Sequence, residues 1–170
     1  MSAETTSGGF TLTSSDIAEG ELIADLHAFN GFGCAGANVS PALSWSGAPP
    51  ETKSFALTCY DPDAPTGSGF WHWVVFNIPA TVTRLPRGAG DPKSPAAPKG
   101  AVQGRTDYGS VGYGGPCPPK GHKPHRYQFT VFAVDVDRLD ADEHSTAAVI
   151  GFNLNFHTLA KATLTGLYGR

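Results

Sequence analysis

The chain of 170 residues has few charged residues and few cysteines, and it lacks any long apolar run. Charged side chains make up 16% of it, below the usual share of about 25%. The formal net charge is only −3, whereas a domain that binds nucleic acid or an anionic lipid surface carries a basic patch. No stretch approaches the roughly 20 apolar residues of a membrane-spanning helix. The composition therefore argues against nucleic acid as a partner and against a membrane span.

Cysteine is scarce, with Cys34, Cys59 and Cys117 and no CxxC pair. An odd number of cysteines without that motif favours free thiols in a reducing compartment, and one disulfide beside one free thiol stays open. Residues 1–9 are small and polar and lack the apolar core of a signal peptide. We therefore expect a cytoplasmic protein with a flexible tail over residues 1–9 and one domain over residues 10–170.

The chain also lacks the common nucleotide-binding and nucleophile motifs. In the glycine-rich segment 107–125, the GxGxxG register fails at Cys117, and prolines stand where that motif must open a helix. There is no GxxxxGK[ST] phosphate loop and no GxSxG elbow, although a Ser/His/Asp triad need not follow a sequence pattern. Taken alone, this segment is interpreted as a rigid connection that permits close backbone approach.

Glycine and proline are abundant, with 21 and 14 residues spread along a chain that is 40% hydrophobic. Such a composition indicates many turns in a folded, strand-rich domain. Runs of β-branched and aromatic residues predict strands at 10–13, 42–45, 55–60, 70–78, 126–135 and 162–168. The strand at 126–135 is apolar on both faces, which predicts a central strand covered on both sides. The proline-rich stretch 79–104 is expected to be a long surface loop.

One late helix is predicted over about 142–160. Asp140 would cap it, with Glu143 three residues further on. Apolar residues at helical spacing follow, namely Val149, Phe152, Phe156 and Leu159. The sequence thus predicts a mainly β, antiparallel domain with one substantial helix near its C-terminal end packed on it.

The stretch 54–79 places two carboxylates, Asp61 and Asp63, in a proline-rich loop between two predicted strands. Because proline fixes φ, these carboxylates are presented on a stiff segment. The bonds before Pro62 and Pro65 are each open to a cis or a trans isomer. A rigid acidic loop of this kind is typical of one wall of a site.

Histidines lie at two predicted strand mouths. Strict alternation predicts that His72 points with Val74 and Phe76, while the neighbouring tryptophans point the other way. A lone histidine on an apolar face is more often a hydrogen-bonded core residue. His125, however, shares a strand face with Tyr127 beside another Pro/Gly-rich loop. Together these residues favour a ligand site.

The one basic cluster of the sequence adjoins this second strand mouth, and its charge favours an anionic ligand. Its members are Lys120, His122, Lys123, His125 and Arg126. Two metal sites are alternatives. Cys117, His122 and His125 match no common zinc spacing and lack a fourth ligand, whereas Asp61, His72 and His125 could form a two-His-one-carboxylate site.

Six segments carry a family resemblance, in this order along the chain: NVSPALSW (38–45), SFALTCYDPDAP (54–65), HWVVFNIP (72–79), YGGPCPPKG (113–121), HRYQFTVFAVD (125–135) and GFNLNFHTLAKATLTGLYG (151–169). In these segments the chain resembles the phosphatidylethanolamine-binding protein (PEBP) family, specifically its bacterial, Raf-kinase-inhibitor-like branch. The resemblance implies a β-sandwich with a small cavity that accepts phosphate-like groups.

The resemblance also implies which residues bind the ligand. Carried over by motif, the ligand-binding residues are Asp61, Phe70, His72, Tyr113, Pro118, Pro119, His125 and Tyr127. Asp63 and Arg126 would brace the loops. Both histidines would donate hydrogen bonds to phosphoryl oxygens, and Asp61 would orient one of them.

We therefore expect a non-enzymatic protein without catalytic residues, metal or cofactor, which binds a small anionic or phosphorylated ligand such as a phosphoethanolamine head group. A regulatory role with a kinase or protease as partner is implied by the resemblance. Two alternatives stay open: a metal-dependent hydrolase that uses Asp61, His72 and His125, and an inhibitor of a partner kinase or protease that needs no ligand. A homodimeric state of the protein is a further alternative that stays open.

Overall fold

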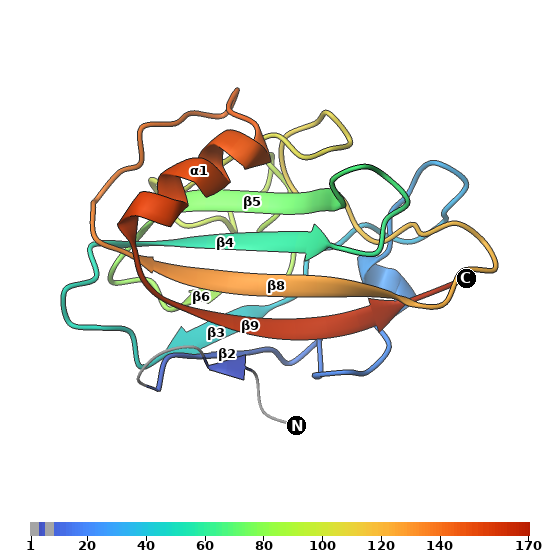
Figure 1. Ribbon diagram of the computed structural model, residues 1–170, viewed down its shortest axis with the longest axis horizontal. Helices are drawn as coiled ribbons and strands as arrows, with labels where there is room; N and C mark the ends of the chain where they lie inside the picture. Colours follow the sequence, from blue (N-terminus) through green and yellow to red (C-terminus); the bar gives the residue numbers. More distant parts are fainter. Residues whose placement is uncertain (1–3, 6–8) are drawn as a thin grey trace.

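A computed structural model describes residues 4–5 and 9–170 of the chain. The described strands form two antiparallel sheets, a larger one in the order β1-β9-β8-β4-β5-β7 and a smaller one in the order β2-β3-β6 (Figure 1). Within the described residues α1 is the one α-helix, and it lies near the C-terminal end. The mainly β, antiparallel sandwich with one late helix is therefore confirmed.

The boundaries of the long strands β4, β5 and β8 lie within one residue of those predicted. The larger sheet consists of β1 (Glu4–Thr5), β4 (Ser54–Asp61), β5 (Phe70–Pro79), β7 (Val102–Gln103), β8 (His125–Val134) and β9 (Thr158–Tyr168). The smaller sheet consists of β2 (Thr11–Thr13), β3 (Leu43–Ser46) and β6 (Arg84–Leu85). Helix α1 covers Ala147–His157, and a short 3-10 helix covers Asp25–His27. No helix in these described ranges is both long and apolar enough to cross a membrane.

Two segments predicted to be irregular contain short strands. Glu4 and Thr5 pair with β9, so this part of the predicted flexible tail joins the larger sheet, whereas residues 1–3 and 6–8 lie outside the described residues. The predicted loop 79–104 supplies β6 and β7, which are the outermost strands at one edge of each sheet. Strands of two residues are short enough to limit edge-to-edge association.

Helix α1 begins later than predicted because its cap is Thr146 and not Asp140. The Thr146 hydroxyl accepts a hydrogen bond from the backbone N–H of Val149 at 3.3 Å. Such a bond satisfies one of the donors left without a partner at a helix N-terminus. The helix ends at His157, and the chain continues directly into β9, which therefore includes Leu159.

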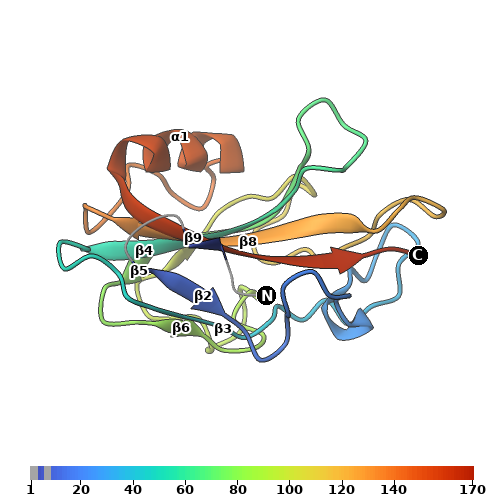
Figure 2. The ribbon, with the colours of Figure 1, turned by 60° about the horizontal axis from the view of Figure 1, so that its bottom comes forward.

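The main core lies between the two sheets. Buried side chains of the smaller sheet, among them Leu12 and Leu43, belong to one cluster with Leu57 of β4 and Val131 of β8. Figure 2 shows the two sheets facing each other, with α1 on the outer face of the larger one. Burial of these apolar side chains from both inner faces is the main stabilising contribution of a sandwich.

Helix α1 covers only part of the outer face of the larger sheet. Ile150 and Leu154 of the helix belong to a second cluster with Val134 at the end of β8. Gln128 and Thr130, nearer the start of β8, are only half-buried. The prediction that this strand is covered on both sides is therefore correct for its second half and wrong for its first half.

Candidate functional site

A cavity of about 330 Å³ lies at the end of the larger sheet where β4 ends and where β5 and β8 begin. Antiparallel pairing brings these three strand ends together. Seven of the eight residues predicted to bind a ligand line the cavity: Asp61, Phe70, His72, Pro118, Pro119, His125 and Tyr127. Its size and its mixed lining are typical of a small-molecule site.

Tyr113, the eighth of these residues, does not line the cavity. Its side chain is buried, its ring meets that of Trp73 edge to face at 5.5 Å, and its hydroxyl donates to the carbonyl of His27 at 2.7 Å. It is a core residue that fastens the segment after residue 105 to the loop that carries His27. The resemblance implied Tyr113 as a ligand-binding residue, whereas the structure places its side chain in the core.

His72 faces the cavity because β5 carries a bulge opposite β4. Cys59 pairs with Trp73 and Tyr60 pairs with Trp71, so His72 is an extra residue between them. Bulges of this kind re-aim a side chain and are common beside functional sites. The predicted alternation fails here: Trp71 packs toward the outer cluster and Trp73 belongs to the inner core.

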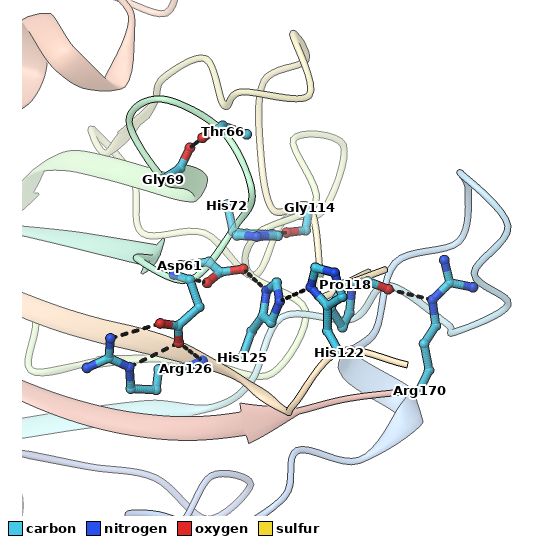
Figure 3. A network of polar contacts seen from close by, with 12 residues as sticks. Asp61, Thr66, Gly69, His72, Gly114, Pro118, His122, His125, Arg126 and Arg170 are labelled. Atoms are coloured by element: carbon cyan, nitrogen blue, oxygen red, sulfur yellow. Dashed lines mark hydrogen bonds and ion pairs between the residues drawn. The ribbon is translucent and has the colours of Figure 1, made fainter. Parts of the chain in front are cut away.

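The His72 imidazole is held in a defined orientation. Its Nδ1 lies 2.7 Å from the carbonyl oxygen of Gly114 (Figure 3). A carbonyl only accepts, so Nδ1 carries the hydrogen. Burial lowers the pKa of His72 to about 4, although the Gly114 carbonyl and Asp61 oppose the shift. Near neutral pH the ring is uncharged, and its Nε2 presents a lone pair.

Asp61 and His125 form a buried pair. Oδ2 of Asp61 lies 2.8 Å from Nδ1 of His125, and Oδ1 accepts the backbone N–H of Asp63 at 2.8 Å. Nε2 of His125 lies 3.2 Å from Nδ1 of His122 (Figure 3). Asp61 thus lies where it can orient His125, the role that the resemblance implied for it.

Tyr127 brings an unpartnered hydroxyl to the cavity. Its side chain is fully buried, and the hydroxyl completes no hydrogen bond among the described residues, although the Asp61 carboxylate lies near enough to act on it as a weak acceptor. Burial, and then the nearby Asp61 carboxylate, raise its pKa well above the ordinary value, so the group is a donor at any ordinary pH. A buried hydroxyl without a partner costs about 1–3 kcal/mol, which makes this position unusual.

Asp63 and Arg126 form an ion pair outside the cavity. Nε and Nη2 of Arg126 donate to the two Asp63 oxygens at 3.0 and 2.9 Å, and the backbone N–H of Arg126 donates to Asp63 at 2.9 Å. The hydrogen bond from the guanidinium lowers the pKa of Asp63 to about 2. The pair joins the loop after β4 to the start of β8, the position that the resemblance implied for it.

Sequence reasoning missed an aromatic wall of the cavity. Tyr108 lines the cavity, stacks on Phe29 at 3.9 Å and meets Phe70 edge to face at 4.7 Å. Phe32, although 75% exposed, lies nearly parallel to Tyr108 at 5.5 Å. The remaining lining residues that were not predicted are Ala64, Pro65, Thr66, Asp107 and Cys117. No local pattern announces Phe32 and Tyr108, because they meet only when two distant loops fold together.

A disulfide joins the two loops that carry this wall. Cys34 and Cys117 are bonded, with their Cα atoms 6.0 Å apart, and Cys59 is a buried free thiol. Of the two cysteine states left open by the sequence, the structure has one disulfide and one free thiol. The favoured expectation of free thiols only is therefore corrected. A disulfide is typical of an oxidising compartment.

The metal alternatives lack a suitable geometry. Cys117 is consumed by the disulfide, and the part of the chain that the structure describes contains no group of three His, Cys, Asp or Glu side chains that could hold a metal ion. The peptide bonds before Pro62 and Pro65 are both trans.

Together, the fold and the cavity define a β-sandwich protein with a small-ligand pocket at one end of its larger sheet. The family model of the phosphatidylethanolamine-binding protein matches residues 13–169. The chain belongs to this family, as the resemblance predicted. Members are in general non-enzymatic binding proteins, which supports a small-ligand-binding or regulatory protein.

Bacterial relatives are similar over nearly the whole chain. YbcL of Escherichia coli is 55% identical over 159 residues, which are 94% of this chain and 87% of YbcL. YbhB of E. coli is 52% identical over 157 residues, covering 92% of this chain and 98% of YbhB. The crystal structure of YbcL, described as a new member of the mammalian PEBP family, matches with a TM-score of 0.94 over 96% of this chain and 99% of that one.

A phosphatidylethanolamine-binding protein from Plasmodium vivax matches with a TM-score of 0.63 at 17% identity, over 95% of this chain and 85% of that one. At that identity the match extends the fold alone to a distant protein.

Proposed function

We propose that this protein is a non-enzymatic binding protein whose cavity takes a small anionic group, with a phosphoryl group as in phosphoethanolamine as the best fit. The observation that carries the proposal is Tyr127, a residue of the cavity lining whose buried hydroxyl has no hydrogen-bond partner among the described residues. Buried polar groups are nearly always hydrogen-bonded, so an unpaired one in a pocket argues for a ligand that supplies an acceptor.

A phosphoryl group suits the other polar groups of the cavity. Its oxygens accept from Tyr127, and from His125 when Nε2 of that ring carries a proton. Both histidines were expected to donate to phosphoryl oxygens. Neutral His72 differs from this expectation, because its Nε2 has a lone pair and can only accept a hydrogen bond. A monoanionic phosphate ester has one P–O–H group, which can donate to that lone pair.

The Asp61 carboxylate does not oppose this assignment. Both of its oxygens already accept hydrogen bonds, from His125 and from the backbone of Asp63. Its charge is therefore compensated within the protein by these two donors. Of the two residues in this pair, a phosphoryl group would then interact with His125, the hydrogen-bond donor.

Calorimetric titration with inorganic phosphate and with O-phosphorylethanolamine tests the proposal. Tyr127→Phe removes only the unpartnered oxygen, so the fold should be as stable as the wild type or more stable, while affinity should fall about three- to tenfold, the equivalent of one hydrogen bond. His125→Ala should bind much more weakly, and affinity should decrease above the pH range where histidines ordinarily titrate. Equal affinity of the wild type and both variants would remove the site assignment.

The resemblance extends the proposal to a regulatory role, in which a kinase or protease is inhibited through this end of the molecule. A pull-down with the wild type and with Tyr127→Phe as bait tests this role, because a partner that recognises the occupied cavity should be recovered by the wild type alone. The cytoplasmic location and the homodimer likewise stay predictions. Counting free thiols in cell extracts tests the location, and light scattering of the purified protein tests the homodimer.

A further inference from the structure

Both ring nitrogens of His125 are engaged in the structure. Nδ1 faces the Asp61 carboxylate at 2.8 Å, and Nε2 faces Nδ1 of His122 at 3.2 Å (Figure 3). The His125 side chain is only 4% exposed, so no further position around the ring is open to a polar partner. His125 in this state has no free N–H for the cavity.

The hydrogen-bond directions follow from the chemistry of the partners. A carboxylate accepts, so Nδ1 of His125 carries a hydrogen. When both rings are neutral, Nε2 of His125 has a lone pair and His122 donates to it. When His125 is an imidazolium, Nε2 carries a hydrogen and donates to His122. An anionic oxygen can meet Nε2 only in the protonated state, and only after His122 has left.

His122 is placed so that it can leave. It lies on an exposed segment whose backbone is held elsewhere, because Gly121 donates to the carbonyl of Arg170 at 3.0 Å and Arg170 donates to the carbonyl of Pro118 at 2.7 Å. The His122 side chain is exposed, and it borders a neighbouring hollow and not the main cavity. His125 borders both hollows, so the contact between the two histidines adjoins the cavity lining.

We propose that His122 is a displaceable cap on His125, a positioning residue that occupies the nitrogen required by an anionic ligand until the ligand replaces it. This inference rests on the anion-binding function proposed above. Binding exchanges the His122···His125 hydrogen bond for one from protonated Nε2 to a ligand oxygen. For a dianionic ligand the proton comes from solvent, so binding is coupled to uptake of one proton.

Charged and titratable groups on every neighbouring element enter this coupling. The Asp61 carboxylate accepts from Nδ1 of His125, and Asp63 is already paired with Arg126. Neutral His72 adds no charge. The titratable and charged groups around the pair are Asp61, Asp63, His72, Asp107, Tyr108, Lys123, Arg126 and Tyr127.

Titration of the full-length protein with inorganic phosphate at pH 8 tests the cap. His122→Ala removes it, so affinity should rise about three- to tenfold, the equivalent of the one hydrogen bond that no longer competes. His122→Gln keeps an amide that can donate to Nε2 and should bind like the wild type. His144→Ala is the matched control, because His144 is another exposed histidine, near Glu143 and outside the cavity lining. Its affinity should not change.

The outcomes separate this inference from the proposed function. If His122→Ala binds phosphate as the wild type does, or more weakly, His122 does not act as a cap. The proposed anion site is unaffected by that result. If neither protein binds phosphate, the proposed function fails and the cap fails with it. Imidazole ¹⁵N NMR gives a second readout, since phosphate should move the His122 signals to those of a solvated ring. Unchanged His122 signals in a phosphate-saturated sample would also overturn the cap.

Discussion

His72 and Gly114 are joined by two hydrogen bonds: the Nδ1–H of His72 donates to the Gly114 carbonyl at 2.7 Å, and the Gly114 N–H donates to the His72 carbonyl at 2.9 Å. This double contact fastens the loop after residue 105 to the start of β5. Because Nδ1–H of His72 is bonded to the Gly114 carbonyl, the ring presents the lone pair of Nε2 to the cavity.

The burial of His72 should make the fold sensitive to acid. Its pKa is about 4 in the folded protein against an ordinary 6.5, so the unfolded chain binds the proton more tightly between these values. Stability should therefore fall as pH decreases from 6.5 to 4, by about 3 kcal/mol at most. Urea denaturation at pH 7.5, 5.5 and 4.5 should show a smaller loss in His72→Gln than in the wild type. Equal losses would contradict the account.

The Asp63–Arg126 pair should act in a lower pH range. The folded pKa of Asp63 is about 2 against an ordinary 3.8, so the pair stabilises above pH 3.8 and its contribution disappears as pH falls toward 2. Both side chains are partly exposed, so Asp63→Asn should cost only about 0.5–1 kcal/mol at pH 7. Chemical denaturation at pH 7 and 2.5 measures the change. Asp137→Asn, at an exposed aspartate without an ion pair among the described residues, is the control and should have no effect at either pH.

The Cys34–Cys117 disulfide should stabilise the fold and order the aromatic wall. It closes a loop across 83 positions of the chain, and replacement of both cysteines by serine should cost about 2–4 kcal/mol. Thiol titration of the unreduced, denatured protein should find one reactive thiol, Cys59, and three after reduction. Three thiols before reduction would restore the expectation of a protein with free cysteines only.

Gly114 should tolerate no side chain. A Cβ there would overlap the ring of Tyr108, which is fixed by its stack on Phe29 and by its hydrogen bond to Gly115. Gly114→Ala should therefore cost about 1–3 kcal/mol and disturb the cavity wall. Gly67→Ala, in a loop position where a Cβ meets nothing within 4 Å, is the matched control and should leave the thermal midpoint nearly unchanged.

The sequence predicted most of the larger sheet because its long strands are marked by local composition. The predicted strands 55–60, 70–78 and 126–135 differ from β4, β5 and β8 by at most one residue at each end. The β5 bulge was not predicted, because it is set by pairing with β4, and His72 therefore points to the cavity against strict alternation. The start of α1 was misplaced because two cap candidates, Asp140 and Thr146, precede the same apolar run.

The site was predicted where motifs carry its residues, and missed where only tertiary contacts do. Asp61, His125 and Tyr127 lie in the DPDAP and HRY segments and meet at one end of the sheet. Tyr113 lies in an equally recognisable segment but points into the core. Tyr108 lies outside every segment that carried the resemblance, and it reaches the cavity because residues 105–115 run back against β5.

The central claim is that the cavity at the ends of β4, β5 and β8 binds a phosphoryl group through Tyr127 and His125. The most direct measurement is the electron density of a crystal grown with phosphate. We expect a tetrahedral ion within hydrogen-bond distance of the Tyr127 hydroxyl and of Nε2 of His125, with the His122 ring turned away. An ion bound only at the surface lysines, with the cavity empty and the His122···His125 contact intact, would contradict the account.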